Sequence, residues 1–141
     1  MTPTTFEDVY SYFLGKIEDY EIQEKLQLDY EFAQELLYDF MKSAIPKFTY
    51  STKDLSDRDE TLLKFNIELT DMEKEILSTL MVVEYLSPKV LKEEYFESRL
   101  GSKDYREFSP ANQLKEVREL RESFKREANS LMIEYYYRQG L

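Results

Sequence analysis

Carboxylates and tyrosines are the side chains in this sequence that could take part in chemistry, because the 141 residues include neither histidine nor cysteine. The lack of imidazole and thiol groups excludes a zinc finger, a cysteine nucleophile and a histidine general base. Asp57 and Asp59 have the spacing that opens a calcium-binding loop, but Leu62 stands where such a loop needs glycine. We therefore expect no metal site.

Catalytic machinery is not indicated elsewhere in the chain. The sequence has no phosphate-binding glycine loop, no dinucleotide-binding fingerprint and no serine nucleophile elbow. Aspartate, glutamate, lysine and tyrosine can form an active site on their own, but nothing in their spacing positions such a set. The sequence therefore predicts a protein that is not an enzyme and has no catalytic residues and no bound cofactor.

The most informative cluster is a run of three tyrosines and an arginine, Tyr135-Tyr136-Tyr137-Arg138. Successive helix residues point about 100° apart, so one helix cannot press all three rings into a single core. One interpretation places Tyr135 in the core and leaves the next two rings partly exposed. The other makes Tyr136, Tyr137 and Arg138 part of a partner interface, because tyrosine and arginine are enriched at such interfaces. We take these last three residues as the candidate interface.

Helices must carry these side chains, and the hydrophobic spacing predicts a mostly α fold: one domain over residues 1–141, a compact bundle of four to five helices. The first helix should begin at Thr4 or Thr5, since Thr4 has a glutamate three residues on, as in a capping box. The second should begin after Asp29, a good N-cap residue, and end near Pro46, which disfavours helix before it.

The third helix is expected to be the central one. Thr70 and Glu73 have capping-box spacing, and the apolar residues that follow as far as Leu86 cover nearly the whole circumference of a helix. A helix that is apolar all round is enclosed by other elements. Pro88 should end or kink this helix, and a short fourth segment should then run to about residue 98.

The last helix is expected to be the longest, from Ser109 to Arg138. Ser109 is a preferred N-cap residue, Pro110 suits the first helical turn, and Gly140 is a natural C-terminal cap. A polar loop over 102–108 precedes it. Apolar residues recur along this segment every three or four positions, which predicts an amphipathic helix with a stripe resembling a coiled-coil seam.

The region 47–69 does not follow helical spacing. Phe48 and Tyr50 alternate with polar residues, and a second alternation runs from Phe65 to Leu69. Alternation at every second position is typical of half-buried strands, and the two stretches could pair with each other. We expect this region to form a short two-stranded hairpin or an extended arm.

Acidic residues outnumber basic ones by 29 to 19, which gives the chain a net charge of −10. Residues 1–46 carry 10 acidic and 3 basic side chains, whereas residues 102–141 carry 7 and 8. This balance disfavours non-specific binding to nucleic acid and to anionic membranes. The acidic charge belongs either to solvated helix faces or to a surface that repels, or mimics, an anionic partner.

Three stretches carry a resemblance to a known family. They are LTDME at 69–73 leading into LMVVEYL at 80–86, SPAN at 109–112 leading into LKEVREL at 114–120, and MIEYYYRQGL at 132–141. Together they resemble the head-to-tail connector, or adaptor, proteins of tailed bacteriophages. The resemblance implies a virion protein made in the host cytoplasm, forming a ring, commonly twelve-fold, beneath the portal protein. Such a ring bridges the portal to the next neck or tail component, and the genome passes through it without sequence-specific binding.

Two other functions stay open. An acidic inhibitor that mimics DNA would need carboxylates spaced along one face like phosphates, and it would bind a basic protein in a strongly salt-dependent way. A helical regulatory binding module would form a heterodimer with one partner and no ring. A membrane is not expected among the partners, because the sequence contains no apolar run of about 18 residues.

Overall fold

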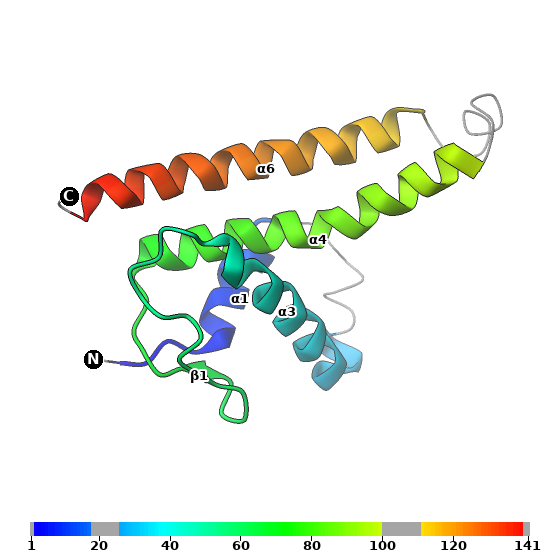
Figure 1. The fold of residues 1–141 in the computed structure, drawn as a ribbon. Helices are drawn as coiled ribbons and strands as arrows, with labels where there is room; N and C mark the ends of the chain where they lie inside the picture. The colour runs from blue at the N-terminus through cyan, green and yellow to red at the C-terminus, as the bar shows by residue number, and fades with distance from the viewer. Residues whose placement is uncertain (1, 18–25, 100–110, 140–141) are drawn as a thin grey trace.

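The computed structural model describes residues 2–17, 26–99 and 111–139, and it is mostly helical (Figure 1). Its elements, in chain order, are α1 (Phe6–Leu14), α3 (Tyr30–Ala44), the 3₁₀ helix η1 (Ile45–Lys47), β1 (Arg58–Asp59), β2 (Lys64–Phe65), α4 (Asp71–Arg99) and α6 (Ala111–Arg138). The predicted fold class, a mostly α bundle with a long C-terminal helix and a short two-stranded hairpin, is confirmed.

Helix α4 lies at the centre of the core, as its apolar circumference predicted. Figure 1 shows α6 along one side of α4, with α1 and α3 on the other side, and all three helices contact α4. Side chains from different faces of α4 are therefore almost fully buried, among them Ile76, Leu77, Met81 and Val82. Burying a side chain of this size contributes roughly 1.5–3 kcal/mol relative to exposure, so packing on both sides holds α4 in place.

Capping side chains define where α3 and α4 begin. The Asp29 carboxylate accepts a hydrogen bond from the Phe32 N–H at 3.2 Å, as predicted for an N-cap residue. At α4, the Thr70 hydroxyl accepts from the Glu73 N–H at 3.2 Å, and Glu73 Oε1 accepts from the Thr70 N–H at 2.7 Å. The predicted capping box at 70–73 is therefore confirmed.

At α1 the predicted capping box on Thr4 is wrong, and Thr5 is the N-cap. Its hydroxyl accepts from the Asp8 N–H at 3.2 Å. Thr4 is buried instead, where its hydroxyl accepts from the Leu69 N–H at 2.8 Å. This hydrogen bond joins the residue before the N-cap of α1 to the segment before α4, 65 residues later in the sequence.

Pro88 does not end α4, which continues for 29 residues to Arg99. Because proline has no N–H, the Glu84 carbonyl loses its usual backbone donor. The neighbouring Ser87 hydroxyl donates to the Val83 carbonyl at 2.8 Å. The predicted break between a third and a fourth helix is therefore wrong. Within the described residues α4 spans 29 residues and α6 spans 28.

Replacing Pro88 with alanine is expected to raise the free energy of unfolding by about 1–2 kcal/mol, because the ring is exposed and a helical hydrogen bond is restored. Urea denaturation followed by circular dichroism measures the change. The matched control is Pro46→Ala in the first turn of η1, where proline is favourable and its loss should lower stability. A Pro88→Ala chain less stable than the wild type would contradict the expectation.

The hairpin in region 47–69 pairs different residues from those predicted. Arg58 faces Phe65 and Asp59 faces Lys64 in an antiparallel pair. Phe48 lies in the turn that follows η1, so the prediction of a strand at 48–50 is wrong. Asp59 explains the position of the hairpin. Its carboxylate accepts from two backbone N–H groups of the turn after β1, a conformation that aspartate favours; the donors are Thr61 and Leu62.

Helix α6 runs alongside α4 for most of its length (Figure 1). Its stripe of apolar residues faces the core through Ala128, Met132 and Tyr135, all of them buried. The other half of the helix surface is exposed, as predicted for an amphipathic helix. The predicted loop over 102–108, the start at 109–110 and the cap at residue 140 lie outside the described residues.

Candidate protein-binding surface

Two residues of the candidate interface lie on the surface at the end of α6, beside a tyrosine from another segment. Tyr136 is 42% exposed and Tyr137 is 72% exposed. The ring centre of Tyr136 lies 5.3 Å from that of Tyr50 and 5.6 Å from that of Tyr137. Ile133 is half exposed and precedes these tyrosines by three and four residues, a spacing that shares one helix face. We call Tyr50, Ile133, Tyr136 and Tyr137 the aromatic patch.

Tyr135 points the opposite way, into the core. It is 3% exposed, and its ring packs edge-on against the Phe48 ring at 5.4 Å. The turn of about 100° per residue explains the division, because burying Tyr135 forces the two following rings toward solvent. The structure therefore places one tyrosine of the run inside and presents the other two outward.

Arg138 pairs within its own helix. Its guanidinium lies 2.6 Å from the Glu134 carboxylate one turn earlier, and both side chains are exposed. A solvent-exposed pair at this spacing stabilises a helix by only about 0.3–0.5 kcal/mol. Arg138 can therefore exchange Glu134 for a partner's carboxylate at little cost. The structure brings Tyr136 and Tyr137 together with Tyr50, and leaves Arg138 beside Glu134.

A buried polar network lies beneath the aromatic patch. The Tyr135 hydroxyl donates to Glu73 Oε2 at 2.7 Å and accepts from the Thr52 N–H at 3.1 Å. Lys53 Nζ donates to Glu73 Oε1 at 2.6 Å. These bonds tie three segments together: the start of α4, the end of α6, and residues 52–53. Tyr136 directly follows Tyr135 and Tyr50 precedes Thr52 by two residues, so the network holds together the two stretches of backbone that carry these rings.

The charges in the network are set by burial and by hydrogen bonds. Burial by itself raises the pKa of Glu73, but hydrogen bonds from Lys53, the Thr70 N–H and Tyr135 outweigh burial, so the pKa lies below its ordinary value. Burial raises the pKa of Tyr135, and its bond to the Glu73 carboxylate raises it further. The Tyr135 hydroxyl therefore stays protonated and donates a hydrogen bond to the ionised Glu73 carboxylate.

Acid should weaken the fold through Glu73. Its pKa is lower in the folded chain than the value of about 4.3 expected unfolded, so the stabilisation is complete above that pH and is lost as the pH falls through the folded pKa. We expect the stability difference between the wild type and Glu73→Gln to be constant above about pH 5 and to shrink below about pH 4. Urea denaturation at pH 7, 5, 4 and 3 measures it.

The matched control for the pH series is Glu116→Gln, which removes an exposed carboxylate from α6. Both variants lose one negative charge, so any general effect of charge appears in both. An effect of breaking the buried network appears only in Glu73→Gln. A difference between wild type and Glu73→Gln that stays the same from pH 7 to pH 3 would contradict the proposed role of this carboxylate.

Sequence reasoning missed four residues of this surface and its support: Tyr50, Ile133, Thr52 and Lys53. Tyr50 was expected in a strand, and nothing singled out Thr52 or Lys53. Glu73 was expected only as the partner of Thr70 in a capping box, a signal that lies within four residues. Its second oxygen contacts Tyr135, 62 residues away in the sequence, and spacing rules contain no information about such a contact.

Two other kinds of feature, a membrane span and a metal cluster, are not found among the described residues. Among the helices of 2–17, 26–99 and 111–139, none is long and apolar enough to cross a membrane. In the same residues no three carboxylates gather closely enough to hold a metal ion. Comparisons of the chain with protein-family models, curated proteins and solved structures gave no match.

Proposed function

We propose that this protein is a non-catalytic adaptor that binds another protein through the aromatic patch. The observation that carries this proposal is the set of four exposed apolar and aromatic side chains beside a buried network that joins the end of α6 to residues 52–53. Tyrosine offers a large contact area and loses little conformational entropy on binding. A backbone that is already held by the buried network reduces this loss further, so such a patch has the properties of an interface hot spot.

The resemblance of the three stretches to phage connectors supports a more specific form of the proposal. In this form the protein is a virion structural protein at the head-to-tail interface. Copies of it form a ring, commonly twelve-fold, beneath the portal protein, and the ring bridges the portal to the next neck or tail component. The net charge of −10 suits a channel through which DNA passes, because carboxylates repel phosphates.

Electron microscopy of the protein with the portal protein encoded in the same genome tests this function. The two are co-expressed, purified through a tag on the portal, and imaged in negative stain. The expected result is an added ring of density on the portal in the mixed sample and none in the portal alone. Portal particles identical in the two samples would contradict the connector function.

A further inference from the structure

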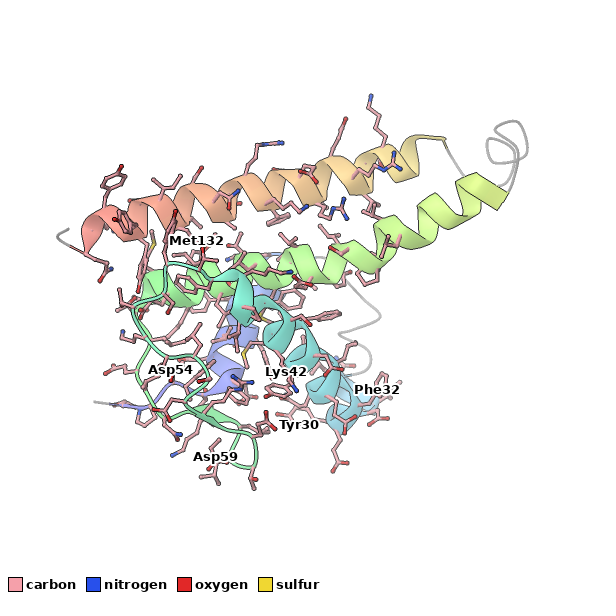
Figure 2. All side chains as sticks on the ribbon, in the orientation of Figure 1. Tyr30, Phe32, Lys42, Asp54, Asp59 and Met132 are labelled. Carbon is pink, nitrogen blue, oxygen red and sulfur yellow. The ribbon has the colours of Figure 1, made fainter. Side chains whose placement is uncertain are left out.

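A second surface lies far from the aromatic patch, in a groove between α3 and the β1–β2 hairpin. The groove has a volume of about 420 Å³, within the range of about 300–1,000 Å³ that ligand sites occupy. Figure 2 shows Tyr30 and Asp59 on the two elements that border it, whereas Met132 labels the opposite side of the molecule, near the end of α6. A partner in this groove therefore leaves the aromatic patch free.

The walls of the groove are apolar and held in place. Tyr30 is 54% exposed, and its hydroxyl donates to the Glu7 carboxylate at 3.2 Å. The Tyr38 ring stacks on the buried Phe6 ring at 5.3 Å. Leu63, in the turn of the hairpin, forms the facing wall and is also exposed. Flat rings already fixed in position offer a surface on which an aliphatic stem or a planar cation can lie.

The rim of the groove is acidic. Glu31 and Glu35 line it from α3 and Glu60 lines it from the hairpin, and no basic side chain is among the described residues that line it. Beside the groove, Arg58 lies 3.9 Å from Glu60, and its Nε donates to the Tyr38 hydroxyl at 3.1 Å. Within the described residues no ion pair involves Glu31 or Glu35. Both carboxylates are exposed and have no ion-pair partner among the described residues, so they attract a positive charge.

The spacing of the acidic side chains strengthens this point. Glu31 and Glu35 stand four residues apart on α3, and the exposed Asp39 continues the same row. Like charges at this spacing destabilise a helix. The helix dipole favours Glu31 in the first turn of α3, but the like charges that follow it at this spacing do not help α3 to fold, and they lie beside a groove with apolar walls.

We propose that this groove binds a basic segment of a partner protein. An arginine of that segment lays its guanidinium against Tyr30 or Tyr38 and bonds to Glu31 and Glu35, and a neighbouring apolar residue contacts Leu63. Arginine fits better than lysine because its planar group stacks on rings and binds carboxylates with two bonds. Nucleic acid and anionic lipid carry the wrong sign for this rim, and a second copy of the chain brings a further net charge of −10.

Titration of the full-length chain with a synthetic peptide, acetyl-Gly-Arg-Leu-Arg-Gly-amide, tests the groove by amide chemical shifts. The shifts should map to α3 and the hairpin, with a dissociation constant below about 1 mM. The same peptide with citrulline in place of arginine, which keeps the shape and removes the charge, should bind at least about tenfold more weakly. No shifts, or equal affinity for the two peptides, would overturn the proposal.

A pair of variants separates the groove from general charge attraction. The double variant Glu31→Gln with Glu35→Gln should lower the affinity for the arginine peptide at least about fivefold. The control, Glu116→Gln with Glu127→Gln, removes the same charge from the exposed face of α6 and should change the affinity less than about twofold. Equal weakening by the two pairs would overturn the proposal. The double variant Tyr136→Ala with Tyr137→Ala should leave peptide binding unchanged. The proposal for the groove and the proposal for the aromatic patch are therefore tested independently.

Discussion

Replacing Glu73 with alanine is expected to lower the free energy of unfolding by about 3 kcal/mol. The side chain is 1% exposed and accepts three hydrogen bonds of 2.6–2.7 Å, from Lys53, the Thr70 N–H and Tyr135. Breaking a buried charge pair costs about 3–5 kcal/mol, since the remaining partner is left without compensation. Lys53 is 32% exposed, so its charge can turn to solvent when Glu73 is removed. The expected loss therefore lies at the lower end of the range of about 3–5 kcal/mol.

Urea denaturation followed by circular dichroism measures this loss, with Glu75→Ala as the matched control on the same helix. Glu75 pairs with Lys16 at 2.8 Å and keeps 35% exposure, far more than Glu73, so its removal should cost only about 1 kcal/mol. Tyr135→Phe keeps the ring and removes the hydroxyl, and a double-mutant cycle with Glu73→Ala should show a coupling above about 0.5 kcal/mol. Similar losses in Glu73→Ala and Glu75→Ala would contradict the buried network.

Replacing both Tyr136 and Tyr137 with alanine is expected to weaken binding to the partner protein at least about 30-fold. Truncating a tyrosine at the centre of an interface typically costs more than about 1 kcal/mol and often 2, and two such losses correspond to this factor. The stability of the chain should change by less than about 1 kcal/mol, because both rings are exposed. Titration calorimetry against the portal protein measures the affinity.

Leu120→Ala is the matched control for this pair. Leu120 is an exposed apolar residue of the same helix, 16 positions before Tyr136, which corresponds to about 24 Å along the helix axis. Its replacement should change the affinity less than about threefold. A double tyrosine variant that binds the portal as well as the wild type does would show that the aromatic patch is not the interface.

The sequence was sufficient where structure follows from residues close together in the chain. The capping box of Thr70 and Glu73 and the N-cap of Asp29 were predicted correctly, because each capping bond spans three residues. The central position of α4 followed from its apolar circumference, which only an enclosed helix can bury. These signals located the helices that carry the candidate interface.

Pro88 shows how packing overrides a local signal. Proline disfavours helix at the residue before it, so a break was expected there. In the folded chain α4 continues past it, and Val90, two residues beyond, is completely buried. The burial of Val90 stabilises the continuation and offsets the missing hydrogen bond. A rule about neighbouring residues does not include such a contribution from tertiary structure.

The support of the candidate interface could not be predicted, for a related reason. The tyrosine run was recognised because its three rings adjoin in sequence, yet the third ring of the aromatic patch, Tyr50, lies 86 residues before Tyr136. Thr52 and Glu73 contact Tyr135 across 83 and 62 residues. Periodicity reports which face of a helix is buried, but not which distant segment covers that face.

Photo-crosslinking from the aromatic patch tests most directly whether this surface binds a partner. Benzoylphenylalanine is placed at position 137 in one chain and at position 120 in another, and each is irradiated in cells that assemble the particle. A crosslink from position 137 to the portal or to a neck protein, identified by mass spectrometry, with none from position 120, is the predicted result. A chain that is incorporated into particles but gives no crosslink to another protein from position 137 would contradict the assignment.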